Sequence, residues 1–216
     1  MSVAAIRARA DLGRLIMIPG AAVMLALDFS ALGHGVRGGP SGVLRWLATG
    51  LVCVFYLLII WCYLRRGKAT ATSSSRTAHV AAVAATSMPF AFPLLAAAPP
   101  QAGVQLAADA LLAAGTAWSA WAMRSLGRNL SVLAQARGLA ERGPYRWVRH
   151  PLYTGELVSA LGLAIAAATP AAAVAWVILC LLQGYRAVKE EQVLLRALPG
   201  YPGYRSRTAA LLPGLF

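Results

Sequence analysis

The sequence predicts an all-α fold: a polytopic integral membrane helical bundle of four spans and a C-terminal helical hairpin, with both termini in the cytoplasm. Hydrophobic residues make up 59% of the 216 residues and charged residues only 12%, about half the charged share of a soluble domain. Apolar runs of about 20 residues, the length of a bilayer-crossing helix, recur along the chain. The net charge of +13 is carried by basic clusters between these runs, so it does not indicate a nucleic-acid partner.

The apolar runs set the order of the elements. We place transmembrane spans at residues 15–32, 44–64, 78–98 and 104–123. A fifth apolar region, 154–185, is interrupted at Thr169-Pro170 and predicts two arms of about 15 residues, which are short for a full crossing. The arms form either two short paired helices or a hairpin that stops partway through the bilayer. Gly155, Gly162 and Gly184 predict close contact between the two arms.

The basic residues give the orientation. Of the 20 Lys and Arg residues, all but Arg37 and Arg45 lie on the same side of the predicted spans. The positive-inside rule therefore places both termini, and the loop after the fourth span, in the cytoplasm. With no organelle-targeting signal in the sequence, we expect a bacterial inner membrane protein whose active site faces the cytoplasm.

Neither the loop after the second span nor the cysteines point to a site. Residues 67–76 are small and polar, a composition typical of a mobile cytoplasmic loop. Cys53, Cys62 and Cys180 all lie inside apolar segments, and the sequence has no CxxC motif or Cys/His cluster. We therefore expect no metal site.

Charged and aromatic residues gather at both ends of the hairpin. Arg149-His150-Pro151-Leu152-Tyr153 precedes the first arm, and Arg186 with Glu190-Glu191 follows the second. Because the chain enters and leaves the hairpin on the cytoplasmic side, these polar ends meet at one mouth. Charge beside hydrocarbon is costly and usually marks a function, so this mouth is the predicted active site.

Four motifs follow one another in the C-terminal part of the chain. They are G-R-N-L-S at 127–131, R-H-P-x-Y at 149–153, R-x-x-x-E-E at 186–191 and paired tyrosines at 201–204. In order and spacing they resemble the isoprenylcysteine carboxyl methyltransferase family, membrane-embedded enzymes that use S-adenosylmethionine and are related to phospholipid methyltransferases. The loop before the second motif is shorter than in the eukaryotic pattern, and Ala140 stands where a larger apolar residue is usual.

The resemblance implies two regions with different tasks. Residues 1–126 would form four transmembrane helices that shape an acceptor pocket, and residues 127–216 would form the catalytic region that binds S-adenosyl-L-methionine. Catalysis would fall to Arg186 and Glu190, with Arg186 also holding the acceptor. The implied cofactor contacts are Gln135, Leu139, Ala140, Tyr145, His150, Pro151, Tyr153, Glu190 and Glu191.

The chemistry of these side chains is compatible with methyl transfer. Glu190 and Glu191 can hold an ammonium group or a ribose hydroxyl through charge-assisted hydrogen bonds. An arginine fork such as that of Arg186 can hold a carboxylate, which is already ionised at neutral pH and needs no base. The sequence thus predicts carboxyl O-methylation of a lipophilic small molecule or lipid.

Several alternatives stay open. The same scaffold could methylate a phospholipid amine or a thiol, with Glu190, Glu191 or His150 as the base. A nicotinamide-dependent membrane reductase and a non-enzymatic transporter or scaffold are the other classes, and the oligomeric state is not indicated. Arg186 and Glu190, four residues apart, could form only a surface salt bridge. Arg146 and Arg149 could serve only as anchors to anionic lipid.

Overall fold

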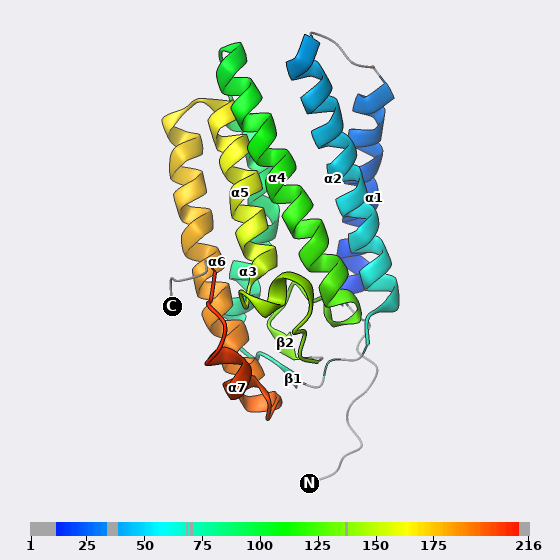
Figure 1. Cartoon of the computed structure of the whole chain (residues 1–216), viewed down its shortest axis with the longest axis vertical. Coiled ribbons are helices and arrows are strands. Elements are labelled where there is room, and N and C mark those ends of the chain that lie inside the picture. Colours follow the sequence, from blue (N-terminus) through cyan, green and yellow to red (C-terminus); the bar gives the residue numbers. More distant parts are fainter. Residues whose placement is uncertain (1–11, 34–38, 68, 70, 137, 212–216) are drawn as a thin grey trace.

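The chain folds into a bundle of long helices with a small polar layer at one end (Figure 1). The computed structural model describes residues 12–33, 39–67, 69, 71–136 and 138–211. The α-helices are α1 (Leu12–Gly33), α2 (Gly39–Arg65), α3 (Arg76–Ser87), α4 (Ala102–Leu126), α5 (Pro151–Ala167), α6 (Pro170–Ala197) and α7 (Tyr201–Arg205). Short 3-10 segments are η2 (Met88–Leu95), η3 (Gly127–Asn129) and η4 (Gly143–Arg146). The predicted helical architecture is confirmed.

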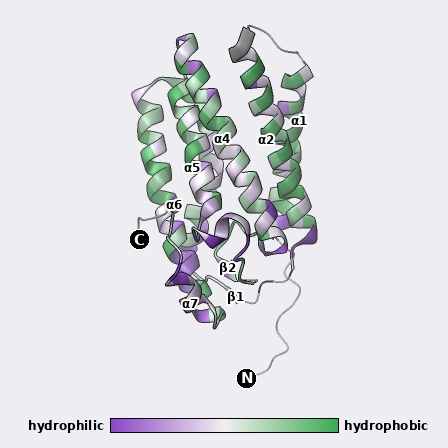
Figure 2. Cartoon of the chain, viewed as in Figure 1, coloured by the Kyte–Doolittle hydropathy of each residue, from purple (hydrophilic) through white to green (hydrophobic). Residues whose placement is uncertain are grey.

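Three helical segments within the described residues are long and apolar enough to cross a membrane. They are Gly42–Arg65, Arg76–Leu95 and Pro170–Ala197, and Pro151–Ala167 is a shorter apolar helix. Figure 2 shows the apolar residues covering the helices over most of their length, with hydrophilic residues at the lower end. The number of full spans and the cytoplasmic placement of the termini stay predictions. Arg37 and the residues at both chain ends lie outside the described residues.

Proline divides the predicted third span into two helical types. The α-helix begins at Arg76, where the Ser75 side chain accepts a hydrogen bond from the Ala78 backbone N–H, and it ends at Ser87. The chain continues as a 3-10 helix through Pro89 and Pro93, because a proline has no N–H to donate to the preceding turn. These prolines therefore change the helix type within the predicted span.

The glycines of the first arm pack against α4. A Cβ atom added at Gly155 would lie 2.7 Å from the Gly115 carbonyl oxygen and 2.8 Å from the Ser119 backbone nitrogen, both in α4. A Cβ atom at Gly162 would lie 2.5 Å from the Ala108 carbonyl oxygen. Nothing lies within 4 Å of a Cβ atom at Gly184. The prediction that these glycines bring the two arms together was wrong, because the close seam joins α4 and α5.

The polar layer is more ordered than the sequence indicated. β1 (Ala71–Thr72), inside the loop that we expected to be mobile, pairs antiparallel with β2 (Gln135–Ala136). The Ser73 backbone N–H extends this pairing by donating to the Ala134 carbonyl at 2.9 Å. Thus a two-stranded ribbon fixes the loop between α2 and α3 against the segment that leads to α5.

The chain after α6 returns to the start of α5. The backbone N–H groups of Arg149 and His150 donate to the carbonyls of Ala209 and Ala210, at 2.8 and 3.0 Å. The Tyr204 hydroxyl donates to the Tyr145 carbonyl at 2.7 Å. These bonds hold the R-H-P-x-Y motif in place from the C-terminal side.

Candidate active site

The beginning of α5 and the last third of α6 face each other, as the hairpin topology predicts. Pro151 occupies the first turn of α5, where its missing N–H leaves no helical bond unmade. Two residues on, the Tyr153 hydroxyl donates to Glu190 Oε2 at 2.8 Å. The rings of His150 and Tyr153 stack with centroids 5.4 Å apart, and His150 Nδ1 lies 3.9 Å from the same Glu190 oxygen. This cluster therefore joins both predicted motifs.

Glu191 points to a different set of partners. Its Oε1 accepts from Arg149 Nε at 2.7 Å and lies 3.2 Å from His150 Nε2. Its Oε2 lies 3.2 Å from Arg205 Nε, and the side chain is only 11% exposed. We call Arg149, Glu191 and Arg205, with the Thr208 carbonyl to which Arg149 also donates, the C-terminal clamp. Both oxygens of Glu191 are thus engaged by the protein itself.

Arg149 and Arg146 differ in their surroundings. The Arg149 side chain is buried in the C-terminal clamp, so the alternative that it anchors the helix to lipid was wrong. Arg146 is exposed, and its guanidinium carbon lies 4.0 Å from the centre of the Trp147 ring. The position of Arg146 remains compatible with an interfacial anchor.

Arg186 is buried beside the cluster instead of lying on the surface. Its Nη1 donates to Gln183 Oε1 at 2.9 Å, and its Nη2 donates to the Val132 carbonyl at 3.1 Å. The guanidinium carbon lies 4.7 Å from the centre of the Tyr153 ring. Within the described residues Arg186 forms no ion pair with Glu190, and its Nε has no hydrogen-bond partner. The surface salt-bridge alternative is therefore wrong.

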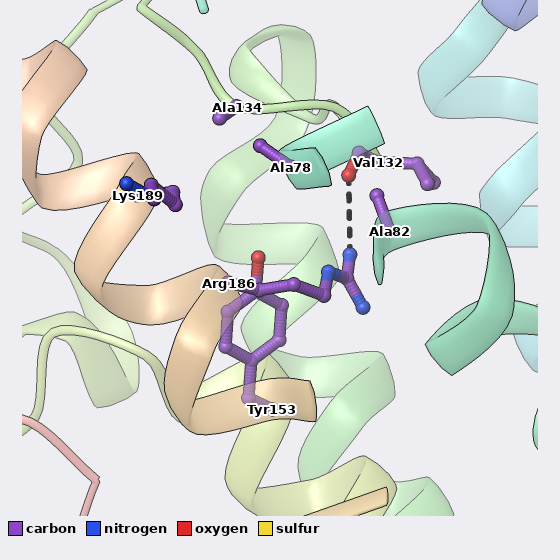
Figure 3. Close-up of a pocket in the computed structure, with 7 residues that line it drawn as sticks. All are labelled: Ala78, Ala82, Val132, Ala134, Tyr153, Arg186 and Lys189. Carbon is purple, nitrogen blue, oxygen red and sulfur yellow. Dashed lines mark hydrogen bonds between the residues drawn. The ribbon is translucent and has the colours of Figure 1, made fainter. Parts of the chain in front are cut away.

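A small pocket opens between this cluster and α3 (Figure 3). Its cavity volume is about 10 Å³, roughly the room that one water molecule needs. Arg186 and Tyr153 line one side of it, and Val132 presents its carbonyl to the guanidinium from the opposite side. The complete lining is Ala78, Ala82, Val132, Ala134, Tyr153, Arg186 and Lys189. The sequence analysis did not anticipate the contribution of α3, because its alanines resemble those of any apolar helix.

The loop residues predicted to bind cofactor lie in other places. Leu139 and Ala140 line a larger and more open hollow of about 300 Å³ with Ser125, Asn129, Glu141 and Arg142. Gln135 belongs to β2, and its Oε1 accepts a hydrogen bond from the Ser131 hydroxyl at 2.8 Å. Neither Gln135, Leu139 nor Ala140 lines the pocket at Arg186. The structure brings together the residues of the two hairpin motifs but not those of the loop.

The tyrosines at the base of the site keep their protons. Burial and the negative charge of Glu190 raise the pKa of Tyr145 well above its ordinary value. Burial also raises the pKa of Tyr201, and it raises the pKa of Tyr204 to about 12. At neutral pH these side chains are therefore neutral hydroxyls, and that of Tyr204 donates to the Tyr145 carbonyl.

Two comparisons with known proteins bear on this geometry. Residues 104–198 match the model of a family described as phospholipid methyltransferase. The fold is similar to a solved structure of a eukaryotic intramembrane Ras methyltransferase, ICMT (isoprenylcysteine carboxyl methyltransferase), determined without a monobody. The TM-score is 0.52 at 18% sequence identity, and the similarity covers 93% of this chain and 76% of that chain. Residues 104–198 thus resemble the phospholipid methyltransferase family, and the fold resembles that of ICMT. No curated protein gives a significant match.

The family match begins in α4 and ends just after α6. It includes both hairpin motifs and the α4–α5 seam, but not α3 or the residues that follow α7. The matched segment thus supplies Val132, Ala134, Tyr153, Arg186 and Lys189 to the pocket, and α3 supplies Ala78 and Ala82.

Two polar residues near the site were missed from the sequence. Glu156 accepts a hydrogen bond from Gln183 Nε2 at 2.6 Å, and Gln183 is completely buried. Glu156 is the only acidic residue in the first predicted arm. A lone carboxylate in an apolar segment is itself an indication of function, and that indication was available in the sequence.

Proposed function

We propose that this protein transfers the methyl group of S-adenosylmethionine to a carboxylate of a lipophilic acceptor, at a site that opens to the cytoplasmic face of a bacterial inner membrane. The observation that carries the proposal is the convergence of Tyr153, Arg186 and Glu190 at the polar end of an apolar hairpin. This arrangement sets an anion-binding group beside a cation-binding group, at the level where a lipid and a soluble cofactor can meet.

The side chains at this site suit the groups of S-adenosylmethionine. Glu190 Oε2 accepts from Tyr153, and Oε1 makes no hydrogen bond to the described residues. That free oxygen can accept from an ammonium group or a ribose hydroxyl. Lys189 lines the same pocket and supplies a positive charge for a carboxylate. When bound, the cofactor supplies a methyl group on a positively charged sulfur, which a carboxylate can accept without losing a proton.

Among the predicted cofactor contacts, Glu190, Tyr153 and His150 have the strongest support. Tyr145 lies near enough to Glu190 for the carboxylate charge to act on its hydroxyl. Glu191 supports the proposal indirectly, because it holds His150 and Arg149 in place. Pro151 sets the start of α5, and Leu139, Ala140 and Gln135 contribute only if the cofactor extends toward the loop.

Arg186 is the residue that we assign to the acceptor. Its side chain is buried and lines the pocket, and its Nε has no hydrogen-bond partner among the described residues. A planar guanidinium binds a carboxylate through two parallel N–H···O bonds, which fixes the position of the oxygens. Alignment of the reacting atoms is the main need of this reaction, so Arg186 acts by positioning and not by proton transfer.

An amine acceptor is the second candidate, and the phospholipid methyltransferase match favours it. An ammonium group must lose a proton before it can accept a methyl group. Glu190 or His150 would then act as the base, since both contact Tyr153, which lines the pocket. Under this candidate Arg186 would hold the phosphate of the lipid instead of a carboxylate.

Calorimetric titration of S-adenosylhomocysteine into detergent-purified protein tests the cofactor assignment. We expect saturable binding by the wild type and a loss of about tenfold to a hundredfold in affinity for Glu190→Gln, because a charge-assisted hydrogen bond contributes about 1.5–3 kcal/mol. Gln192→Ala, an exposed position on the same helix, is the control and should bind as the wild type does. No binding by folded wild-type protein would contradict the proposal.

Acceptor chemistry is read in a second assay. Purified protein is incubated with labelled S-adenosylmethionine and vesicles that contain either a long-chain carboxylic acid or an amine-bearing phospholipid. Base-labile methyl ester supports carboxyl methylation, and base-stable label on the headgroup supports the amine candidate.

A further inference from the structure

A chain of three polar side chains runs between α5 and α6, inside the apolar hairpin. Glu156 Oε2 accepts from Gln183 Nε2 at 2.6 Å, and Gln183 Oε1 accepts from Arg186 Nη1 at 2.9 Å. Gln183 is fully buried and Arg186 nearly so. Of these three residues, only Arg186 has a role in the proposed reaction. The roles of Gln183 and Glu156 are therefore still to be explained.

The donors and acceptors of this chain allow one arrangement. A guanidinium can only donate hydrogen bonds, so the oxygen of the Gln183 amide must face Arg186. The amide NH₂ then faces the other way and needs an acceptor, which Glu156 supplies. A positive charge and a negative charge thus stand at opposite ends of one buried amide.

The guanidinium of Arg186 is fixed on three sides. Nη1 donates to Gln183, Nη2 donates to the Val132 carbonyl, and the Tyr153 ring packs against the guanidinium. Only Nε has no partner within the described residues, although it is buried. Buried donors are almost always paired, so a donor left open at the wall of a pocket indicates a ligand group that completes it.

We infer that Gln183 and Glu156 are positioning residues, which hold Arg186 so that its Nε edge meets the acidic group of the acceptor. Gln183 sets the rotation of the guanidinium about its long axis. Glu156 holds Gln183 and offsets part of the positive charge. The inference rests on the proposed function for the role of Arg186, but its test does not depend on methyl transfer.

The test measures the preference for a carboxylate over the matched alcohol. Binding of oleate and of oleyl alcohol to detergent-purified protein is compared for the wild type, Gln183→Met, Glu156→Gln and Gln192→Met. The last variant makes the same change at an exposed glutamine of α6. S-adenosylhomocysteine titration of every variant reports whether the cofactor side of the site is intact.

The expected results differ between the two site variants. The wild type and Gln192→Met should prefer oleate by about tenfold, the scale of one charge-assisted fork. Gln183→Met should reduce this preference to about twofold, because the guanidinium is no longer aimed. Glu156→Gln keeps an acceptor for Gln183 and removes the negative charge, so the preference should be kept or increased.

Three results would overturn the inference. They are an unchanged preference in Gln183→Met, a lost preference in Glu156→Gln with intact S-adenosylhomocysteine binding, and no preference in the wild type. If Gln183→Met does not fold, the result for Glu156→Gln decides. A lost preference for oleate with intact S-adenosylhomocysteine binding then overturns the inference, and a kept or increased preference supports it. A wild type that prefers oleate but does not bind S-adenosylhomocysteine would remove the methyltransferase proposal and leave the assignment of Gln183 and Glu156 standing.

Discussion

Two charged regions lie next to each other on the last turns of α6, and they differ in how completely their polar atoms are paired. In the C-terminal clamp both oxygens of Glu191 are engaged by Arg149, His150 and Arg205. In the pocket region, which we define as Arg186, Tyr153 and the adjoining Glu190, one Glu190 oxygen and the Arg186 Nε make no hydrogen bond to the described residues. Neighbouring glutamates of the same motif therefore differ in how many of their oxygens are paired.

The difference separates charges that hold the fold from charges that are available to a ligand. The clamp connects α6 to the start of α5 and to the C-terminal segment, so it fixes the frame of the site. The pocket keeps the unpaired atoms that recognition requires. The R-x-x-x-E-E motif thus combines a carboxylate whose two oxygens are both paired and one that bonds through a single oxygen, and each can be tested apart from the other.

Glu191→Gln should give the largest effect on stability. It leaves the buried guanidinium of Arg149 without its counter-charge, and breaking a buried pair in this way costs about 3–5 kcal/mol. We expect a strongly lowered unfolding temperature in detergent, whereas Glu190→Gln should stay close to the wild type. Equal destabilisation by the two substitutions would remove the distinction between clamp and pocket.

The contrast between these two glutamates also shows which features could not be predicted from the sequence. The apolar runs predicted α1, α2, α4 and the hairpin, because a helix that crosses a membrane must be about 20 residues long and apolar. Topology alone placed the two motifs at one mouth. Which glutamate bonds to Tyr153 and which enters the C-terminal clamp depends on the rotation of α6, which no periodicity in a largely apolar helix reveals.

Contacts between distant segments were equally hidden. The pairing of β1 with β2 involves two residues on each side, too few for a recognisable strand pattern. The direction of Gly155 and Gly162 toward α4 could not be predicted, because small residues permit a close approach without specifying the partner helix. Glu156 was visible in the sequence, but its link to Arg186 runs through Gln183 and needed the structure.

Gly155→Ala should disturb the frame on which both regions depend. The new Cβ would lie under 3 Å from two backbone atoms of α4, so α4 and α5 must separate, at a cost of about 1–3 kcal/mol. Gly184→Ala is the matched control, since its Cβ meets nothing within 4 Å. We expect a lower unfolding temperature only for the first variant; a similar loss in both would show that the seam is not the close contact.

Tyr153→Phe should sharpen the comparison from the pocket side. The substitution removes only the hydroxyl that donates to Glu190, and a hydrogen bond of this kind contributes about 0.5–1.5 kcal/mol. Affinity for S-adenosylhomocysteine, measured by calorimetry, should fall by up to about tenfold. The unfolding temperature should change little. Tyr185→Phe, which removes a hydroxyl that bonds to Thr77 at the surface, should leave the affinity for S-adenosylhomocysteine unchanged.

Tyr204→Phe should give the smallest effect, and it tests the clamp side through pH. The folded state raises the pKa of Tyr204 to about 12 because its ring is buried, whereas an unfolded tyrosine titrates near pH 10. Below about pH 10 both states hold the proton, so the contribution of the neutral hydroxyl is complete. As the pH rises from about 10 to 12 only the unfolded state ionises, and the free energy of unfolding falls.

We therefore expect the wild type to lose stability over this pH range. Tyr204→Phe should lose less stability over the same range, but it should be less stable than the wild type at pH 9, because the bond to the Tyr145 carbonyl is absent. Unfolding temperatures between about pH 9 and pH 11 measure the two slopes, and parallel slopes would mean that the neutral Tyr204 hydroxyl is not part of what holds the C-terminal segment on α5.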